Sequence, residues 1–190
     1  MMNSKRELHL QVMKDLSLRF IQPLSPSSAW VYKVAEEDKL RSIKIADATD
    51  MLEIFEDVQK ENEALQKTSE ISGVVKLVSF YEKTYAGVPL RAIVRKYVKG
   101  KVLFDGRTHF QELKKNQQAM LESTVRALHK KGIASLDIMG RNVVLASSGV
   151  PYLIDFGTAR LRDSCSDDLF QSHIRADFER LDGLFRRYRV

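Results

Sequence analysis

The feature that most constrains this chain is a set of polar residues placed between short apolar segments in its second half. Asp137 follows one apolar stretch, Asn142 lies five positions later, and Asp155-Phe156-Gly157 follows a pair of further apolar segments. Ser147-Ser148-Gly149 stands between the two segments of that pair and is a typical turn sequence. The spacing therefore predicts a hairpin over residues 143–154 that brings Asp155 back beside Asp137 and Asn142.

These residues and their separations resemble the catalytic loop and the metal-binding loop of protein kinases, whose pattern is H-R-D-x-x-x-x-N followed by D-F-G. The chain keeps the Asp, the Asn and the whole D-F-G, and has Ser135-Leu136 where His-Arg usually stands. Five positions of fixed residue type at fixed offsets are rarely met by chance in a chain of 190 residues. The alternative is a surface turn in which Asp and Asn serve only as turn formers.

The resemblance implies phosphoryl transfer with ATP and Mg²⁺ as cofactors. This reaction depends mainly on positioning the nucleophile and neutralising the charge that spreads over the phosphoryl group. By resemblance, Asp137 is the catalytic residue that orients the substrate hydroxyl and accepts its proton, and Asn142 and Asp155 bind the metal. The lysine that often follows two residues after the catalytic Asp is Met139 here. Arg141 is a candidate for that missing positive charge.

The first half of the chain reads as strands interrupted by one helix. The strand patterns cover residues 17–22, 30–34, 40–46, 74–80 and 90–98, with helical periodicity over 50–67 and a short helix or an arm over 3–14. With the resemblance, this order predicts an α+β, two-lobed, protein kinase-like fold. Its N-terminal lobe (1–98) has a five-stranded antiparallel sheet plus one helix, and its truncated C-terminal lobe (99–190) is mostly helical. The two lobes form a single minimal kinase domain over 1–190.

Lys44 lies between two isoleucines in a predicted strand, where a buried ammonium needs a partner. By resemblance it contacts the phosphates of ATP and pairs with a glutamate of the following helix. Glu61 is the predicted partner because Ala64 and Leu65 follow it at three and four residues, which resembles the family's glutamate followed by a buried pair, and Glu63 is held in reserve. The alternative is an edge-strand lysine whose ammonium reaches water.

Three further residues are assigned to the nucleotide by the resemblance. Val31 follows the segment that covers the phosphates, and the main-chain groups of Lys96 and Val98 read the adenine edge. The family's glycine-rich pattern would fall on residues 24–31, where none of its three glycines is present. Glycine there allows backbone N–H groups to approach a phosphate closely, so the chain departs from the family at this loop.

The remaining segments predict a small helical lobe. Residues 109–131 have helical periodicity and end at Gly132, and residues 169–187 form the last predicted helix. His129 is expected to be a satisfied or exposed helix-end histidine and not a metal ligand. The usual A-P-E segment is absent, and the tail that begins at Asp177 resembles the D-F-x-x-L ending of the short kinases that bacteria inject into host cells by type III secretion.

Composition excludes several other classes of protein. The net charge of +6 favours acidic partners, among which the phosphates of a nucleotide are one. No zinc spacing and no alternation of aromatic and basic residues points to nucleic acid, so none is expected as a partner. The single Cys165 fits a reducing compartment. The sequence has no run of about eighteen apolar residues, so no transmembrane segment is predicted. Residues 1–14 do not resemble a signal peptide.

The sequence thus predicts an ATP- and Mg²⁺-dependent serine/threonine protein kinase. By resemblance it is a bacterial effector secreted into the host cytoplasm, whose partner is a host protein such as a heat-shock chaperone or the ubiquitin-conjugating machinery. Two alternatives stay open. One is a small-molecule kinase of the sugar or lipopolysaccharide type, which shares this loop chemistry. The other is a pseudokinase that acts as a binding module, which the lost glycines and the lost lysine suggest.

Overall fold

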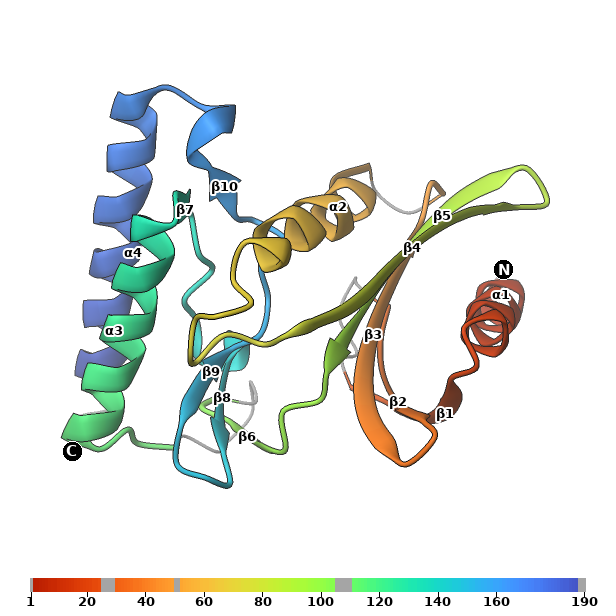
Figure 1. Ribbon diagram of the computed structural model, residues 1–190, viewed down its shortest axis with the longest axis horizontal. Coiled ribbons are helices and arrows are strands. Elements are labelled where there is room, and N and C mark those ends of the chain that lie inside the picture. The colour runs from red at the N-terminus through yellow and green to blue at the C-terminus, as the bar shows by residue number, and fades with distance from the viewer. Residues whose placement is uncertain (1, 25–29, 50–51, 105–110, 188–190) are drawn as a thin grey trace. The chain divides into compact units, whose positions relative to one another are not determined.

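A computed structural model describes residues 2–24, 30–49, 52–104 and 111–187 (Figure 1). These residues form an α+β, kinase-like fold with a five-stranded antiparallel sheet, as predicted. The chain divides into two compact units, Met1–Asn62 with Leu77–Tyr97 and Glu63–Lys76 with Val98–Val190. The last of the divisions between the units falls after Tyr97, next to residue 98, where the N-terminal lobe was predicted to end. The segment Glu63–Lys76, which lies within that predicted lobe, groups instead with the second unit.

The first unit is built on one sheet with strand order β1-β2-β3-β5-β4, in which all neighbours are antiparallel. Ala86 and Gly87 both have positive φ and form the tight turn between β4 and β5. The elements are α1 (Met2–Asp15), β1 (Arg19–Pro23), β2 (Trp30–Glu36), β3 (Lys39–Asp47), α2 (Leu52–Gln66, which runs on into the second unit), β4 (Leu77–Tyr85) and β5 (Val88–Lys96).

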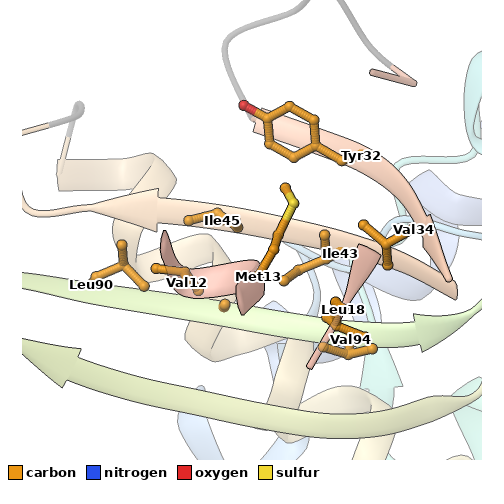
Figure 2. Packing of buried hydrophobic residues seen from close by; sticks show 10 residues of the cluster. Val12, Met13, Leu18, Tyr32, Val34, Ile43, Ile45, Leu90 and Val94 are labelled. Carbon is orange, nitrogen blue, oxygen red and sulfur yellow. The ribbon is translucent and has the colours of Figure 1, made fainter. Parts of the chain in front are cut away.

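The helix α1 packs on one face of this sheet. Its Val12 and Met13 are fully buried against Ile43 and Ile45 of β3, together with neighbouring residues of β2 and β5 (Figure 2). Because side chains alternate across a strand, the two isoleucines that flank Lys44 face α1 and Lys44 itself faces the other side. Of the short helix or arm predicted over residues 3–14, the helix is therefore present, and it covers the face of the sheet opposite Lys44.

The second unit contains two long helices and several short strands. Figure 1 shows α3 and α4 side by side, and the strands β6, β8 and β9 form a three-stranded sheet, while β7 pairs with β10. The elements are β6 (Gly100–Val102), α3 (Lys115–Lys130), β7 (Ile133–Ala134), a 3₁₀ turn (Gly140–Asn142), β8 (Val143–Ala146), β9 (Pro151–Leu153), β10 (Arg160–Leu161), a second 3₁₀ turn (Arg162–Ser164) and α4 (Asp167–Arg187).

The helix α3 begins later than predicted. Residues 109 and 110 lie outside the described residues, and 111–114 are not helical. The side-chain oxygen of Gln117 accepts a hydrogen bond from the main-chain N–H of Lys114, which satisfies a donor that the helix leaves unpaired and fixes its start at Lys115. The end is as predicted, because Gly132 has a φ of +75° and its N–H donates to the carbonyl of His129.

The strand predicted over residues 74–80 is wrong in its first half. Gly73 and Val75 exchange main-chain hydrogen bonds with Leu153 of β9 at 2.8 and 3.0 Å, so this segment is paired within the second unit. β4 begins only at Leu77. Val74 and Val75 pair with a strand, as β-branched residues favour, but that strand is β9 and not one of the large sheet. Among the described residues, no helix combines the length and the apolar character needed to cross a bilayer.

Candidate active site

Lys44 is buried in the middle of β3 and pairs with a carboxylate of α2. Its Nζ donates to Oε2 of Glu61 at 3.0 Å, and Glu61 is fully buried. Ala64 and Leu65, on which the choice of Glu61 rested, are buried as well, whereas Glu63 is exposed. The predicted ion pair between Lys44 and Glu61 is therefore present, and the alternative of an edge lysine that reaches water is wrong.

The other oxygen of the same carboxylate binds a second cation. Arg95 of β5 is buried, and its Nη1 donates to Oε1 of Glu61. Sequence reasoning missed this residue, although the signal was available. Arg95 follows Ala92-Ile93-Val94, so it sits in the same setting as Lys44, a cation within an apolar strand. One buried carboxylate thus serves two positively charged side chains from neighbouring strands.

Val31 lies directly opposite Lys44 in the pairing of β2 with β3, so the two side chains are on the same face of the sheet. Lys96 is the last residue of β5 and pairs with Arg41. Val98 follows two residues later and belongs to the second unit. The nucleotide contacts of these three residues stay predictions. Most of the segment aligned with the glycine-rich loop, residues 25–29, lies outside the described residues.

In the second unit, Asp137 and Asn142 are joined directly. The amide nitrogen of Asn142 donates to Oδ2 of Asp137 at 2.8 Å and to its main-chain oxygen at 2.9 Å. The main-chain N–H of Met139 donates to that same oxygen at 2.8 Å, which tightens the loop. Asn142 is buried, whereas the side chain of Asp137 is 22% exposed. The loop thus presents one partly accessible carboxylate held by a buried amide.

The hairpin of β8 and β9 brings Asp155 to this loop. Ile154, the residue before Asp155, donates its N–H to the main-chain oxygen of Asn142 at 3.1 Å. Oδ1 of Asp155 accepts the N–H of Gly157 at 3.1 Å, and Phe156 between them is buried. A continuous series of hydrogen bonds therefore connects Asp137 through Asn142 to the residue beside Asp155. The structure brings the three together as the spacing predicted.

Asp177 of α4 supports this loop from beneath, and sequence reasoning did not assign it a role. The side chain is fully buried, and its Oδ1 accepts the N–H of Leu136, the residue before Asp137, at 2.8 Å. Its Oδ2 lies 3.0 Å from Nε2 of His129, at the end of α3. His129 thus lies at a helix end with its Nε2 paired, as expected, while its buried Nδ1 has no hydrogen-bond partner among the described residues. The signal for Asp177 was its place in the apolar stripe of α4 formed by Phe170, Leu181 and Leu184.

The backbone two residues before Asp137 is strained. Ser135 has a φ of +58°, a left-handed conformation that costs a side-chain-bearing residue about 1–2 kcal/mol. The hydroxyl of Thr158 donates to the main-chain oxygen of Ser135 at 2.9 Å, and Nη1 of Arg180 donates to that of Leu136 at 3.3 Å. With Asp177, these contacts hold both peptide groups, so the strain is maintained where Asp137 is presented.

Arg141 lies close to the carboxylate of Asp137. Its Nη2 is 3.2 Å from Oδ2 of Asp137, whereas Met139 at the position of the usual lysine is exposed. The guanidinium therefore lies beside the carboxylate of Asp137, which is compatible with the prediction that Arg141 replaces the missing lysine. Whether it acts on a phosphoryl group stays a prediction.

The residues predicted to hold magnesium have suitable chemistry. Mg²⁺ prefers oxygen ligands and commonly takes only one or two carboxylates, the rest being water and phosphate oxygens. Because Nδ2 of Asn142 donates to Asp137, the Oδ1 of the amide is the atom that remains for a cation. Within the described residues no group of three or more His, Cys, Asp or Glu forms a metal site of its own. Asn142 and Asp155 therefore fit a metal that a nucleotide brings with it.

Comparisons with known proteins agree with this geometry. A family model described as the protein kinase domain matches residues 26–176, which is most of the chain. A search of curated proteins found no match. The matched region contains Lys44, Glu61, Asp137, Asn142 and Asp155. The chain belongs to the protein kinase domain family.

Proposed function

We propose that the chain is an ATP- and Mg²⁺-dependent serine/threonine protein kinase, which a bacterium delivers into a host cell to phosphorylate a host protein. The observation that carries the proposal is the hydrogen-bonded connection from Asp137 through Asn142 to Ile154, next to Asp155. A module that only binds a partner has no need to hold these polar groups together at the end of a hairpin. The kinase family itself is shown by the domain match.

Asp137 orients the substrate hydroxyl and accepts its proton. Its carboxylate is partly exposed, and the amide of Asn142 and the guanidinium of Arg141 both contact Oδ2. Two donors on one oxygen restrict rotation of the carboxylate and leave Oδ1 to face the hydroxyl. General-base assistance of this kind contributes typically about 10²–10⁴-fold to a rate.

Asn142 and Asp155 would hold a magnesium ion, which would supply positive charge to the transferred phosphoryl group. Lys44 contributes a second positive charge on the phosphates, and Glu61 holds its ammonium in place. These residues supply position and charge, which is what this reaction needs from a protein.

The host partner is proposed from the resemblance to short effector kinases, which places a heat-shock chaperone and the ubiquitin-conjugating machinery first among the proteins to test. Lysate from eukaryotic cells, heated to inactivate its own kinases, is a suitable first source of acceptors. Phosphoamino acid analysis of labelled bands then separates serine and threonine from tyrosine.

The decisive assay incubates the purified chain with γ-labelled ATP and Mg²⁺, with lysate or with sugar acceptors. Asp155→Ala removes one predicted metal ligand, and Asp168→Ala removes an exposed carboxylate of the same unit as a matched control. We expect label on protein, lost in Asp155→Ala by about 10²-fold or more and unchanged in Asp168→Ala.

The other outcomes correspond to the two alternatives. Label on a sugar with none on protein would identify a small-molecule kinase. Absence of label on any acceptor, together with capture of a partner that Asp155→Ala still binds, would identify a pseudokinase. Equal labelling by Asp155→Ala and the unchanged chain would contradict the proposed role of Asp155.

A further inference from the structure

Glu61 is held by cations from two different strands. Oε2 accepts from Lys44 of β3 at 3.0 Å, and Oε1 accepts from Arg95 of β5. The exposed fractions of the three side chains are 5% for Lys44, 6% for Arg95 and 0% for Glu61. A charge in such a dry setting is stable only when it is paired and hydrogen-bonded. Both oxygens of this carboxylate are satisfied in that way.

The sheet register explains why both cations reach one carboxylate. Lys44 pairs with Ile93, and Arg95 lies two residues beyond Ile93 on the same strand. Side chains two residues apart point to the same face, so Arg95 is the diagonal neighbour of Lys44 on the face that Glu61 approaches. The opposite face of these strands is the apolar one that α1 covers. Arg95 is therefore directed toward Glu61 by the strand itself.

We infer that Arg95 is a positioning residue for phosphoryl transfer, which keeps Glu61 paired while Lys44 contacts the phosphates of the nucleotide. This inference rests on the proposed function. If Lys44 were the only partner of Glu61, any movement of its ammonium toward phosphate would leave a buried carboxylate uncompensated, and this opposes binding. With Arg95 in place, Glu61 stays satisfied and Lys44 can divide its hydrogen bonds between carboxylate and phosphate.

The chemistry of the two cations suits this division of work. The guanidinium is a planar, permanently charged group that holds a carboxylate in a fixed geometry. The ammonium is a compact charge on a flexible stem, with three donors that can serve more than one acceptor. Arg95 thus anchors the carboxylate, and Lys44 remains the adaptable group that meets the substrate.

Arg91 provides a matched control on the same strand. It lies four residues before Arg95, and it too binds a glutamate of α2, with Nη1 3.5 Å from Oε1 of Glu56. Its guanidinium also covers the ring of Phe55 at 4.2 Å. The Arg91 side chain is 17% exposed and its partner Glu56 is 48% exposed, so this pair fastens the helix at the surface without touching Lys44 or Glu61.

The experiment measures kcat and KM for ATP in Arg95→Leu, Arg95→Lys and Arg91→Leu, with folding checked by thermal unfolding. We expect Arg95→Leu to raise KM for ATP and to lower kcat, with kcat/KM reduced by about 10- to 100-fold. Arg95→Lys should recover most of the loss, because it restores the charge. Arg91→Leu should stay within about twofold of the unchanged chain even where its unfolding temperature falls. If Arg95→Leu does not fold, Arg95→Met replaces it.

A double-mutant comparison separates positioning from plain stabilisation. Because Arg95 acts through Glu61 and Lys44, the double variant Arg95→Leu/Lys44→Ala should be no worse than Lys44→Ala alone. A folded Arg95→Leu chain with unchanged kcat and KM overturns the inference, and so do losses that multiply in the double variant.

A binding measurement distinguishes failure of this inference from failure of the proposed function. If the unchanged chain transfers no phosphate, calorimetric binding of Mg²⁺·ATP takes the place of kinetics. Weaker binding in Arg95→Leu but not in Arg91→Leu then supports the role of Arg95 in a chain that is not a kinase. Equal binding by both variants, or no binding by the unchanged chain, overturns it.

Discussion

The side-chain amide of Asn142 donates to Oδ2 of Asp137 at 2.8 Å, while the carbonyl of the same asparagine accepts the N–H of Ile154 at 3.1 Å. One residue thus fixes the carboxylate of the loop through its side chain and the end of the hairpin through its main chain. Any change that moves the main chain at Asn142 displaces Asp137 and the segment that carries Asp155 together.

The role of Asp137 as a base predicts a large loss without unfolding. Asp137→Asn keeps the size of the side chain and removes the group that accepts a proton. We expect labelling of protein to fall by about 10²–10⁴-fold, while the urea midpoint changes little because the residue is partly exposed. Comparing rates and urea unfolding of the variant with those of the unchanged chain tests this. A variant with more than a tenth of the original activity would show that another group accepts the proton.

Replacing Asp177 by alanine is expected to lower both the stability and the turnover of the chain. Asp177→Ala leaves the N–H of Leu136 and the ring of His129 without their buried partner, and we expect the free energy of unfolding to fall by about 2–4 kcal/mol. Because the strained peptide before Asp137 loses its support, kcat should fall more than KM for ATP rises. Asp182→Ala, on the same helix with a side chain 68% exposed, is the control. Unchanged kcat in a folded Asp177→Ala chain would limit Asp177 to a structural role.

Two glycines of the second unit predict opposite effects of the same substitution. A Cβ on Gly100 would lie 2.8 Å from Cα of Ala146 and closer still to the carbonyl of Leu145, because β6 and β8 approach closely there. Gly100→Ala should therefore destabilise the chain by about 1–3 kcal/mol. Gly183 is inside α4 with nothing within 4 Å of its Cβ position, so Gly183→Ala should stabilise by up to about 1 kcal/mol. Urea unfolding of both variants tests the pair, and a matching sign would contradict it.

Replacing Asp47 by asparagine is expected to lower the stability of the chain at neutral pH but not in acid. Burial raises the pKa of Asp47, but hydrogen bonds from the hydroxyl and N–H of Thr49 and the charge of Lys5 outweigh burial and lower it below its ordinary value. A carboxyl whose pKa is lower in the folded chain stabilises the fold above its ordinary pKa of about 3.9, and the contribution is lost as the pH falls through the folded value. Asp47→Asn should therefore be less stable at pH 7 by about 1–3 kcal/mol.

The same Asp47→Asn variant should approach the unchanged chain as the pH falls below 4, and urea unfolding at a series of pH values measures this. Asp38→Asn, in the exposed turn between β2 and β3, serves as its control. A difference that persisted at the lowest pH would show that packing of Asp47, and not its charge, carries the effect.

The parts of the site that the sequence predicted are those whose partners are close along the chain or follow a regular alternation. Asp137, Asn142 and Asp155 lie within one loop and one hairpin, and Lys44 was recognised from its place in an apolar strand. The two residues that were missed act over longer separations, since Asp177 binds Leu136 41 positions away and Arg95 binds Glu61 34 positions away. The apolar setting of Arg95 and of Asp177 indicates that each needs a buried partner, but which partner it finds depends on how the helices dock.

Errors in the predicted elements have the same origin. The start of α3 depends on one hydrogen bond from Lys114 to Gln117, and helical periodicity before it could not reveal where the helix begins. Val74 and Val75 are β-formers, as the strand prediction assumed, but they pair with β9 and not with the large sheet. Local propensity selected the backbone conformation there, and packing selected the partner.

The hydrophobic packing of α1 on the sheet has a practical consequence for recombinant work. A fragment trimmed to the matched residues 26–176 would lack Val12 and Met13 as well as the buried Leu181 and Leu184 of α4. It would expose hydrophobic surface in both units and is expected to precipitate or to require detergent. Any shortened version of the protein made for expression or crystallisation should therefore retain both α1 and α4 in full.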